Sequence, residues 1–175
     1  MREPERRKTT TRSFRVDESA LAAIENDAAK ANVSVNAFIN QLLLSYCNFD
    51  RYFGQFQMIK IGTDGFVYLL GSVPDEAAAE AGRRTALGIV RSVILAKHGS
   101  LDLSTVLDYL RMMSEYGKIY TLNESEMGGK RAVTLVHNLG TKGSTYYAQY
   151  LATVFDMIGL KPKITTTEKA VTASF

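Results

Sequence analysis

Residues 11–16, Thr-Arg-Ser-Phe-Arg-Val, form a short alternating pattern that leads directly into a helix start at Asp17. Alternation between two faces predicts a β-strand, and Asp17 followed by Glu18 is typical of a helix N-terminus. A strand followed by helices has no hydrogen-bonding neighbour within its own segment, and unpaired backbone groups are costly. This part of the chain can therefore fold stably only if another strand pairs with residues 11–16.

Two helices are predicted behind the strand. The first, within residues 18–31, has a narrow apolar stripe and ends at Asn32, a residue that tolerates the left-handed conformation. Ser34 is predicted to cap a second helix at residues 35–49, whose apolar stripe is much wider. About forty residues cannot bury this much apolar surface alone, so we expect a homodimer. The predicted shared core consists of Phe14, Val16, Leu21, Ile24, Phe38, Ile39, Leu42 and Leu43.

The net charge of +3 is unevenly distributed along the chain. Residues 1–16 carry six basic side chains against two acidic ones, whereas residues 17–50 carry one basic side chain against five acidic ones. Positive charge confined to one short segment indicates a local contact with a polyanion rather than a uniformly basic protein. We expect residues 1–10 to be a flexible basic arm.

Composition limits the other classes of protein. The chain of 175 residues is 46% hydrophobic and 22% charged, which is typical of a folded protein. The single cysteine, Cys47, excludes an intrachain disulfide and favours a reducing compartment. No apolar run is long enough to span a membrane, and the first residues lack the apolar segment of a signal peptide. We therefore expect a cytoplasmic protein with no membrane partner.

The stretch "RSFRVDESALAAIENDAAKANVSVNAFINQLLLSY" resembles the ribbon-helix-helix family of DNA-binding proteins, the group of the Arc and methionine repressors. Its most specific part is "VSVNAFINQLL", which follows an Asn-containing turn at the family's usual distance behind the strand. The resemblance covers residues 11–49. It implies that two chains intertwine, that their strands form an antiparallel ribbon in the major groove of double-stranded DNA, and that four helices form the common core.

The resemblance also implies roles for individual residues. The outward face of the ribbon would contact bases through Thr11, Ser13 and Arg15. Contacts to the DNA backbone would come from Arg7, Lys8, Arg12, Ser34, Val35 and Asn36. The family often has a basic residue where this chain has Val35, so the basic arm would compensate for weaker anchoring by the helix start.

Residues 50–175 are predicted to form a second domain of the α+β class, with helices and strands in separate stretches. Its expected role is oligomerisation above the dimer or binding of an unknown small-molecule effector. The predicted elements are a strand at 57–61, an apolar segment at 64–73, helices at 74–97 and 102–116, a hairpin at 118–138, a helix at 144–158 and one or two strands at 161–175.

Few residues of this domain could bind a metal or an anion. It contains two histidines, His98 and His137, and no cysteine, so we predict neither a metal site nor a cofactor. His98 is interpreted as a cation at a helix end and His137 as a core histidine. The segment "HNLGTKGSTYY" could bind an anion through free amides, but a tight turn into a helix capped by Ser144 is the favoured interpretation.

No combination of nucleophile, base and acid is evident, so we do not expect an enzyme. The favoured function is a sequence-specific transcriptional regulator, a repressor in particular. An architectural or partition protein of low sequence specificity and an antitoxin that regulates its own expression remain alternatives. A further alternative is a dimerisation module that never contacts DNA.

Overall fold

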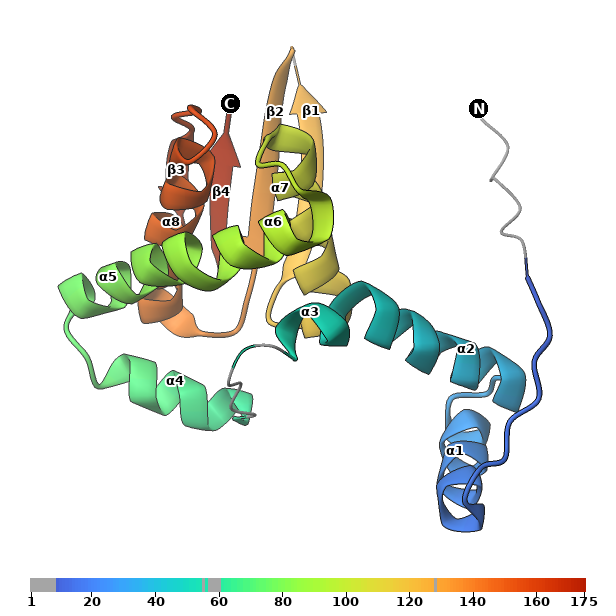
Figure 1. Cartoon of the computed structure of the whole chain (residues 1–175). Helices are drawn as coiled ribbons and strands as arrows, with labels where there is room; N and C mark the ends of the chain where they lie inside the picture. The colour runs from blue at the N-terminus through green and yellow to red at the C-terminus, as the bar shows by residue number, and fades with distance from the viewer. Residues whose placement is uncertain (1–8, 55, 57–60, 128) are drawn as a thin grey trace. The chain divides into compact units, whose positions relative to one another are not determined.

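The structure is a computed structural model that describes residues 9–54, 56, 61–127 and 129–175 (Figure 1). The fold is mixed α+β with a four-stranded antiparallel sheet, which confirms the predicted class at this level. The chain divides into two compact units, Met1–Leu44 and Ser45–Phe175, whereas the sequence prediction placed the boundary after residue 49. Among the described residues, no helix has the length and apolar character needed to cross a membrane.

The described part of the N-terminal unit is a pair of helices. Asp17 caps α1 (Glu18–Lys30), as predicted: its carboxylate accepts hydrogen bonds from the backbone amides of Ser19 at 2.9 Å and Ala20 at 3.3 Å. The prediction for Asn32 is also confirmed, because its φ is 55°. Its amide donates to the carbonyl of Ala29 and that of Val33 to Ala28, so this helix end is a Schellman motif.

The strand predicted at residues 11–16 is not formed in the single chain. Residues 9–17 have no regular secondary structure and no neighbouring strand. The physical reason is that a β-strand is stabilised by hydrogen bonds to a neighbour. In the single chain, this segment has no partner strand among the described residues. The predicted ribbon would need the same segment of a second chain.

The second helix, α2 (Val35–Ser45), continues into a π-helical turn, η1 (Tyr46–Asp50), and a last short turn, α3 (Arg51–Phe53). These last turns pack within the C-terminal unit. The rings of Phe49 and Phe53 are 4.6 Å apart, and the Asn48 side-chain amide donates to the hydroxyl of Tyr116 at 3.2 Å. The predicted strand at 57–61 lies almost wholly outside the described residues, and the apolar segment after it forms α4 (Thr63–Gly71).

The predicted helix at 74–97 is confirmed as α5 (Asp75–Thr85), η2 (Ala86–Val90) and α6 (Arg91–His98), which follow one another as one long helix (Figure 1). It ends at Gly99, whose φ of 71° is the left-handed conformation that favours glycine. The next helix, α7 (Leu103–Met112), begins with a capping box between Asp102 and Thr105. A π-helical turn, η3 (Met113–Gly117), follows it.

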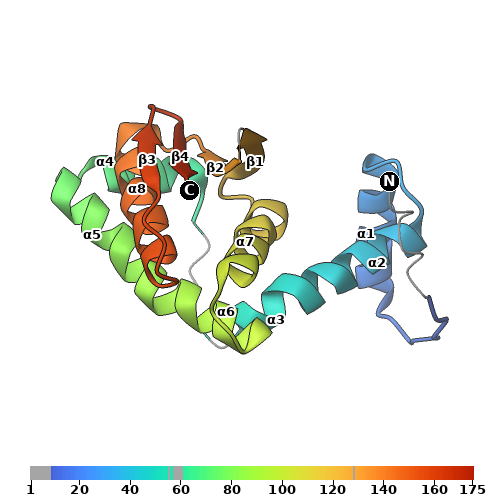
Figure 2. The ribbon, with the colours of Figure 1, turned by 90° about the horizontal axis from the view of Figure 1, so that it is seen from above.

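The predicted hairpin is confirmed by strands β1 (Thr121–Met127) and β2 (Lys130–Val136). Two strands at the C-terminus, β3 (Lys163–Thr166) and β4 (Ala170–Ser174), complete the sheet in the order β1-β2-β4-β3. Figures 1 and 2 show α7 and α8 (Gly140–Asp156) on the same side of this sheet. Val133 and Leu135 of β2 are buried in the core, whereas the residues between and after them are more exposed.

The predicted start of α8 is wrong. The helix begins at Gly140 rather than after Ser144, because the φ of 66° at Gly140 lets the chain turn directly from the end of β2 into the helix. Ser144 is therefore an internal, buried residue and not a cap. Further along, α8 crosses α5 so closely that a Cβ atom at Gly82 would lie 2.2 Å from the carbonyl oxygen of Tyr146.

Candidate nucleic-acid interface

The N-terminal unit leaves most of its predicted core uncovered. Of the described residues 9–44, Ala28 is the one buried residue. Phe14 is 78% exposed and Val16 51%, and on α2 Leu42 is 48% and Leu43 54% exposed. Full burial of one such side chain is worth about 1.5–3 kcal/mol. This unit therefore carries apolar surface whose burial would stabilise an assembly with another molecule.

The other residues of the predicted shared core are also incompletely covered. Leu21 is exposed, and the remaining three side chains are half-buried. Those three are Ile24, Phe38 and Ile39. The structure thus places the eight predicted core residues on the segment before α1 and on the two helices, without enclosing any of them completely.

The three predicted base-contacting side chains are exposed and uncommitted. Thr11, Ser13 and Arg15 lie in the segment before α1, and no hydrogen bond or ion pair to another described residue engages their side chains. The same holds for Arg12. Their donors and acceptors can therefore bind a ligand without breaking an internal bond. Arg7 and Lys8, the predicted backbone contacts in the arm, lie outside the described residues.

The start of α2 has the polar groups that the prediction assigned to phosphate binding. The Ser34 hydroxyl accepts a hydrogen bond from the amide of Ala37 at 3.2 Å, which confirms its role as a helix cap. Val35 is half-buried and Asn36 is exposed. Backbone amides in the first turn of a helix lack partners within the helix and can donate to a phosphate oxygen. The first turn of α2 can therefore be capped by Ser34 and still offer backbone amides to a phosphate group.

Acidic side chains on α1 limit where a polyanion could bind. Asp17 and Glu18 lie at its start, and Asp27 forms an exposed ion pair with Lys30 at 3.4 Å near its end. The hydrogen bonds from Ser19 and then from the amide of Ala20 hold the pKa of Asp17 below its ordinary value, so this carboxylate stays charged. Contacts with phosphate groups are therefore favoured at the basic segment before Asp17 and disfavoured along α1.

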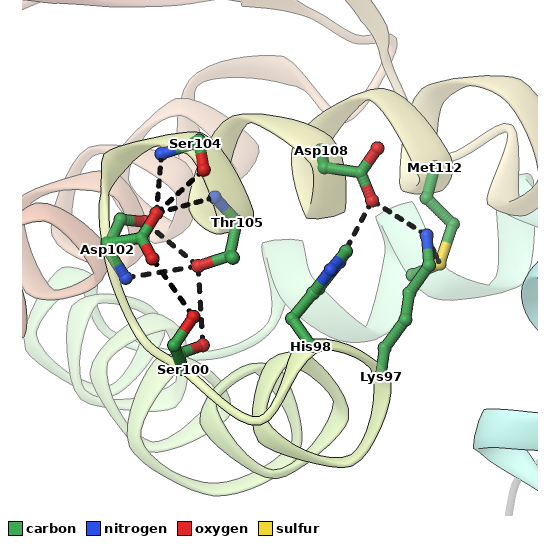
Figure 3. Close-up of polar contacts among 8 residues, drawn as sticks. All are labelled: Lys97, His98, Ser100, Asp102, Ser104, Thr105, Asp108 and Met112. Atoms are coloured by element: carbon green, nitrogen blue, oxygen red, sulfur yellow. Dashed lines mark hydrogen bonds and ion pairs between the residues drawn. The ribbon is translucent and has the colours of Figure 1, made fainter.

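His98 is the last residue of α6, as the sequence predicts, and it belongs to an ion-pair cluster (Figure 3). Asp108 Oδ2 lies 2.7 Å from Lys97 Nζ and 3.0 Å from His98 Nε2. Burial opposes ionisation of Asp108, but Lys97 and His98 outweigh burial and hold its pKa below the ordinary value. The cluster joins α6 to α7. Within the described ranges, no group of three or more His, Cys, Asp or Glu side chains is arranged to hold a metal ion.

His137 is a buried, fully bonded histidine, which confirms its interpretation as a core residue. Its Nδ1 accepts a hydrogen bond from the amide of Leu139, so the proton is on Nε2, 3.2 Å from the hydroxyl of Ser144. That hydroxyl in turn donates to the carbonyl of Thr167 at 2.5 Å. Burial lowers the pKa of His137, so the ring is neutral and connects β2, α8 and the turn before β4.

Two side chains of the segment "HNLGTKGSTYY" are engaged by other parts of the C-terminal unit. The hydroxyl of Ser144 is committed to Thr167, and the ammonium group of Lys142 is paired with the carboxylate of Asp75. The direct passage of this segment into α8 confirms the favoured interpretation, a tight turn into a helix, although the helix begins at Gly140 and not after Ser144.

The sequence analysis did not predict a cluster of tyrosines in the C-terminal unit, of which four are buried and Tyr146 is half-buried. The rings of Tyr147 and Tyr120 are 5.6 Å apart, and those of Tyr147 and Tyr150 are 5.9 Å apart, both edge to face. Burial raises the pKa of each member, so the hydroxyls stay protonated. The cluster consists of Tyr109, Tyr120, Tyr146, Tyr147 and Tyr150. Three of these tyrosines recur at helical spacing in "TYYAQY", which was the available signal.

Comparison of the chain with protein-family models, with curated proteins and with solved structures gives no match.

Proposed function

We propose that this protein is a homodimeric DNA-binding transcriptional regulator, a repressor in particular, whose residues 11–16 pair with the same residues of a second chain. The proposal rests on the resemblance of residues 11–49 to the ribbon-helix-helix family. The observation that carries it is the exposure of Phe14 and Val16 next to the uncommitted side chains of Thr11, Ser13 and Arg15. Pairing would satisfy the backbone of this segment and bury its apolar side chains together with those of α2.

In such a ribbon, alternation separates two faces. Phe14 and Val16 would face the four helices of the two chains, and Thr11, Ser13 and Arg15 would face the floor of the major groove. The two-fold axis supplies each of these side chains twice. Arg15 can donate to O6 and N7 of guanine through both arms of its guanidinium group, and the two hydroxyls can donate to or accept from base edges. The start of α2, around Ser34, would hold a phosphate on each side of the ribbon.

The decisive experiment combines site selection with an arginine variant. Genomic fragments bound by the purified full-length protein give the preferred site and its half-site spacing, and fluorescence anisotropy then gives the affinity for that site. We expect Arg15→Ala to weaken binding by about 1–3 kcal/mol, or roughly 5- to 150-fold, and to relax the base preference. Arg91→Ala is the matched control, since Arg91 is an exposed arginine of α6 in the other unit.

The other outcomes would contradict the proposal in different ways. Unchanged binding by Arg15→Ala would remove Arg15 from base recognition. Binding with little sequence preference and a steep salt dependence would replace the regulator by an architectural or partition protein. A dimer that binds no DNA would be a dimerisation module, and co-purification of a small toxin would identify an antitoxin.

A further inference from the structure

A cavity of about 560 Å³ lies within the C-terminal unit. It is bounded by α4, the end of η3, the segments that flank the β1–β2 hairpin and the first half of α8. Aromatic and aliphatic side chains form most of its wall, among them Phe66, Ile119, Tyr120, Leu139 and Tyr147. Small-molecule sites have volumes of roughly 300–1,000 Å³ and are lined in this way, with a few polar groups that orient the ligand.

The polar groups of the wall differ in what they can still bind. The hydroxyl of Ser114 accepts a hydrogen bond from the amide of Leu122, and both ring nitrogens of the neutral His137 are engaged. Lys118 is different: it is exposed, and no hydrogen bond or ion pair to a described residue engages its ammonium group. No acidic residue is among those that line the cavity in the described part of the chain.

From these features we infer that the cavity binds a small organic acid with one or two aromatic rings. The rings would pack against Phe66 and Tyr147, and the carboxylate would pair with Lys118, the one lysine or arginine among the described lining residues. A second cavity, of about 680 Å³ along α8, is lined mainly by threonine and alanine, contains Glu168 and has no aromatic residue. Its lining does not favour an aromatic anion.

The left-handed conformation of Lys118, with φ 52°, determines the choice of variant. Asparagine tolerates this conformation better than most residues, so Lys118→Asn removes the charge while keeping the turn. Lys130→Asn is the matched control, because Lys130 is an exposed lysine of β2 outside the cavity. The probes are 2-naphthoate and its neutral counterpart 2-naphthalenemethanol, titrated by calorimetry into the full-length protein without DNA.

We expect the wild-type protein and Lys130→Asn to bind 2-naphthoate more tightly than the alcohol. Lys118→Asn should lose about tenfold or more in affinity for 2-naphthoate and none for the alcohol, as expected when a hydrogen bond to a charged group is removed. Phe66→Ala should weaken both probes, provided that its thermal unfolding remains cooperative.

Three results would overturn the inference: no binding of 2-naphthoate, equal affinity for acid and alcohol in the wild type, or unchanged 2-naphthoate binding by Lys118→Asn. None of them bears on DNA binding, which is measured on other residues.

Discussion

The crossing of α5 and α8 leads to a sharp prediction about a single methyl group. Gly82 is buried, and a Cβ atom there would lie 2.2 Å from the carbonyl oxygen of Tyr146 and 3.2 Å from the backbone nitrogen of Tyr150. Non-bonded carbon atoms normally lie about 3.5–4.0 Å from their neighbours. Because the obstacle is helix backbone rather than a flexible side chain, Gly82→Ala requires α8 to move away by about 1 Å, which loosens its contacts with α5.

Two opposing effects decide the magnitude. Overpacking of this kind costs about 1–3 kcal/mol, and the upper part of the range applies because the contact is with backbone. Alanine regains up to about 1 kcal/mol over glycine inside a helix. We therefore expect Gly82→Ala to lower the free energy of unfolding by about 2 kcal/mol, which corresponds to a fall in Tm of about 4–8 °C for a chain of this size.

Gly88 provides the matched control for this prediction. It lies in η2 of the same long helix, and a Cβ atom there would meet no heavy atom within 4 Å. Gly88→Ala should raise the free energy of unfolding by up to about 1 kcal/mol, since the helix gains and nothing is displaced. Both variants can be compared by thermal unfolding followed with circular dichroism. The reasoning is refuted if Gly82→Ala is as stable as Gly88→Ala.

Three further predictions concern other parts of the molecule. Burial lowers the pKa of His137 in the folded protein below its ordinary value of 6.5. As the pH falls, the unfolded chain therefore binds a proton at this residue before the folded chain does. The contribution of the neutral His137 to the free energy of unfolding is present above about pH 6.5 and is lost as the pH decreases below it. Denaturant titrations at several pH values should show this slope, and His137→Gln should lack it. Asn32→Val should lower Tm, because a β-branched residue disfavours the φ of 55° there, whereas Asn32→Gly should not. Leu42→Glu should convert the proposed dimer to a monomer in sedimentation, because Leu42 belongs to the predicted shared core. The control Asn40→Glu, at another exposed position of α2, should remain a dimer.

The sequence predicted helix ends correctly where a cap residue or a left-handed residue at the end itself determines them. Asp17 and Asn32 marked the two ends of α1, and Gly99 marked the end of the long helix through its left-handed conformation. The hairpin predicted at residues 118–138 is formed by β1 and β2, and alternation along β2 accounts for the burial of Val133 and Leu135. These features follow from hydrogen bonds and φ angles within a few residues, which the sequence displays directly.

The errors arose where distant residues decide the outcome. Serine is a common helix cap, but Ser144 lies inside α8, which begins at Gly140. Its hydroxyl donates a hydrogen bond to the carbonyl of Thr167, 23 residues further along the chain. The predicted helix at 35–49 is formed, and a hydrogen bond between Asn48 and Tyr116, which are 68 residues apart, holds its last turn. No periodicity within one segment can reveal such partners.

The alternation of residues 11–16 and the resemblance to the ribbon-helix-helix family predicted the residues of the candidate site and their pairing in a dimer, of which the single chain contains one half. Thr11, Ser13 and Arg15 are exposed and uncommitted in the single chain, and the strand that would align them is not formed. Its formation depends on hydrogen bonds from a second copy, so the geometry of the proposed interface is a property of two chains.

The distribution of tyrosine gives the C-terminal unit an intrinsic spectroscopic probe that residues 1–44 lack. All nine tyrosines lie between Tyr46 and Tyr150, the chain has no tryptophan, and residues 1–44 contain neither. The packed rings around Tyr147 should dominate the near-ultraviolet signal of the C-terminal unit, while helices of both units contribute to the far-ultraviolet signal. A titration followed at both wavelengths can therefore tell whether the two units unfold together or one after the other, without any label being introduced.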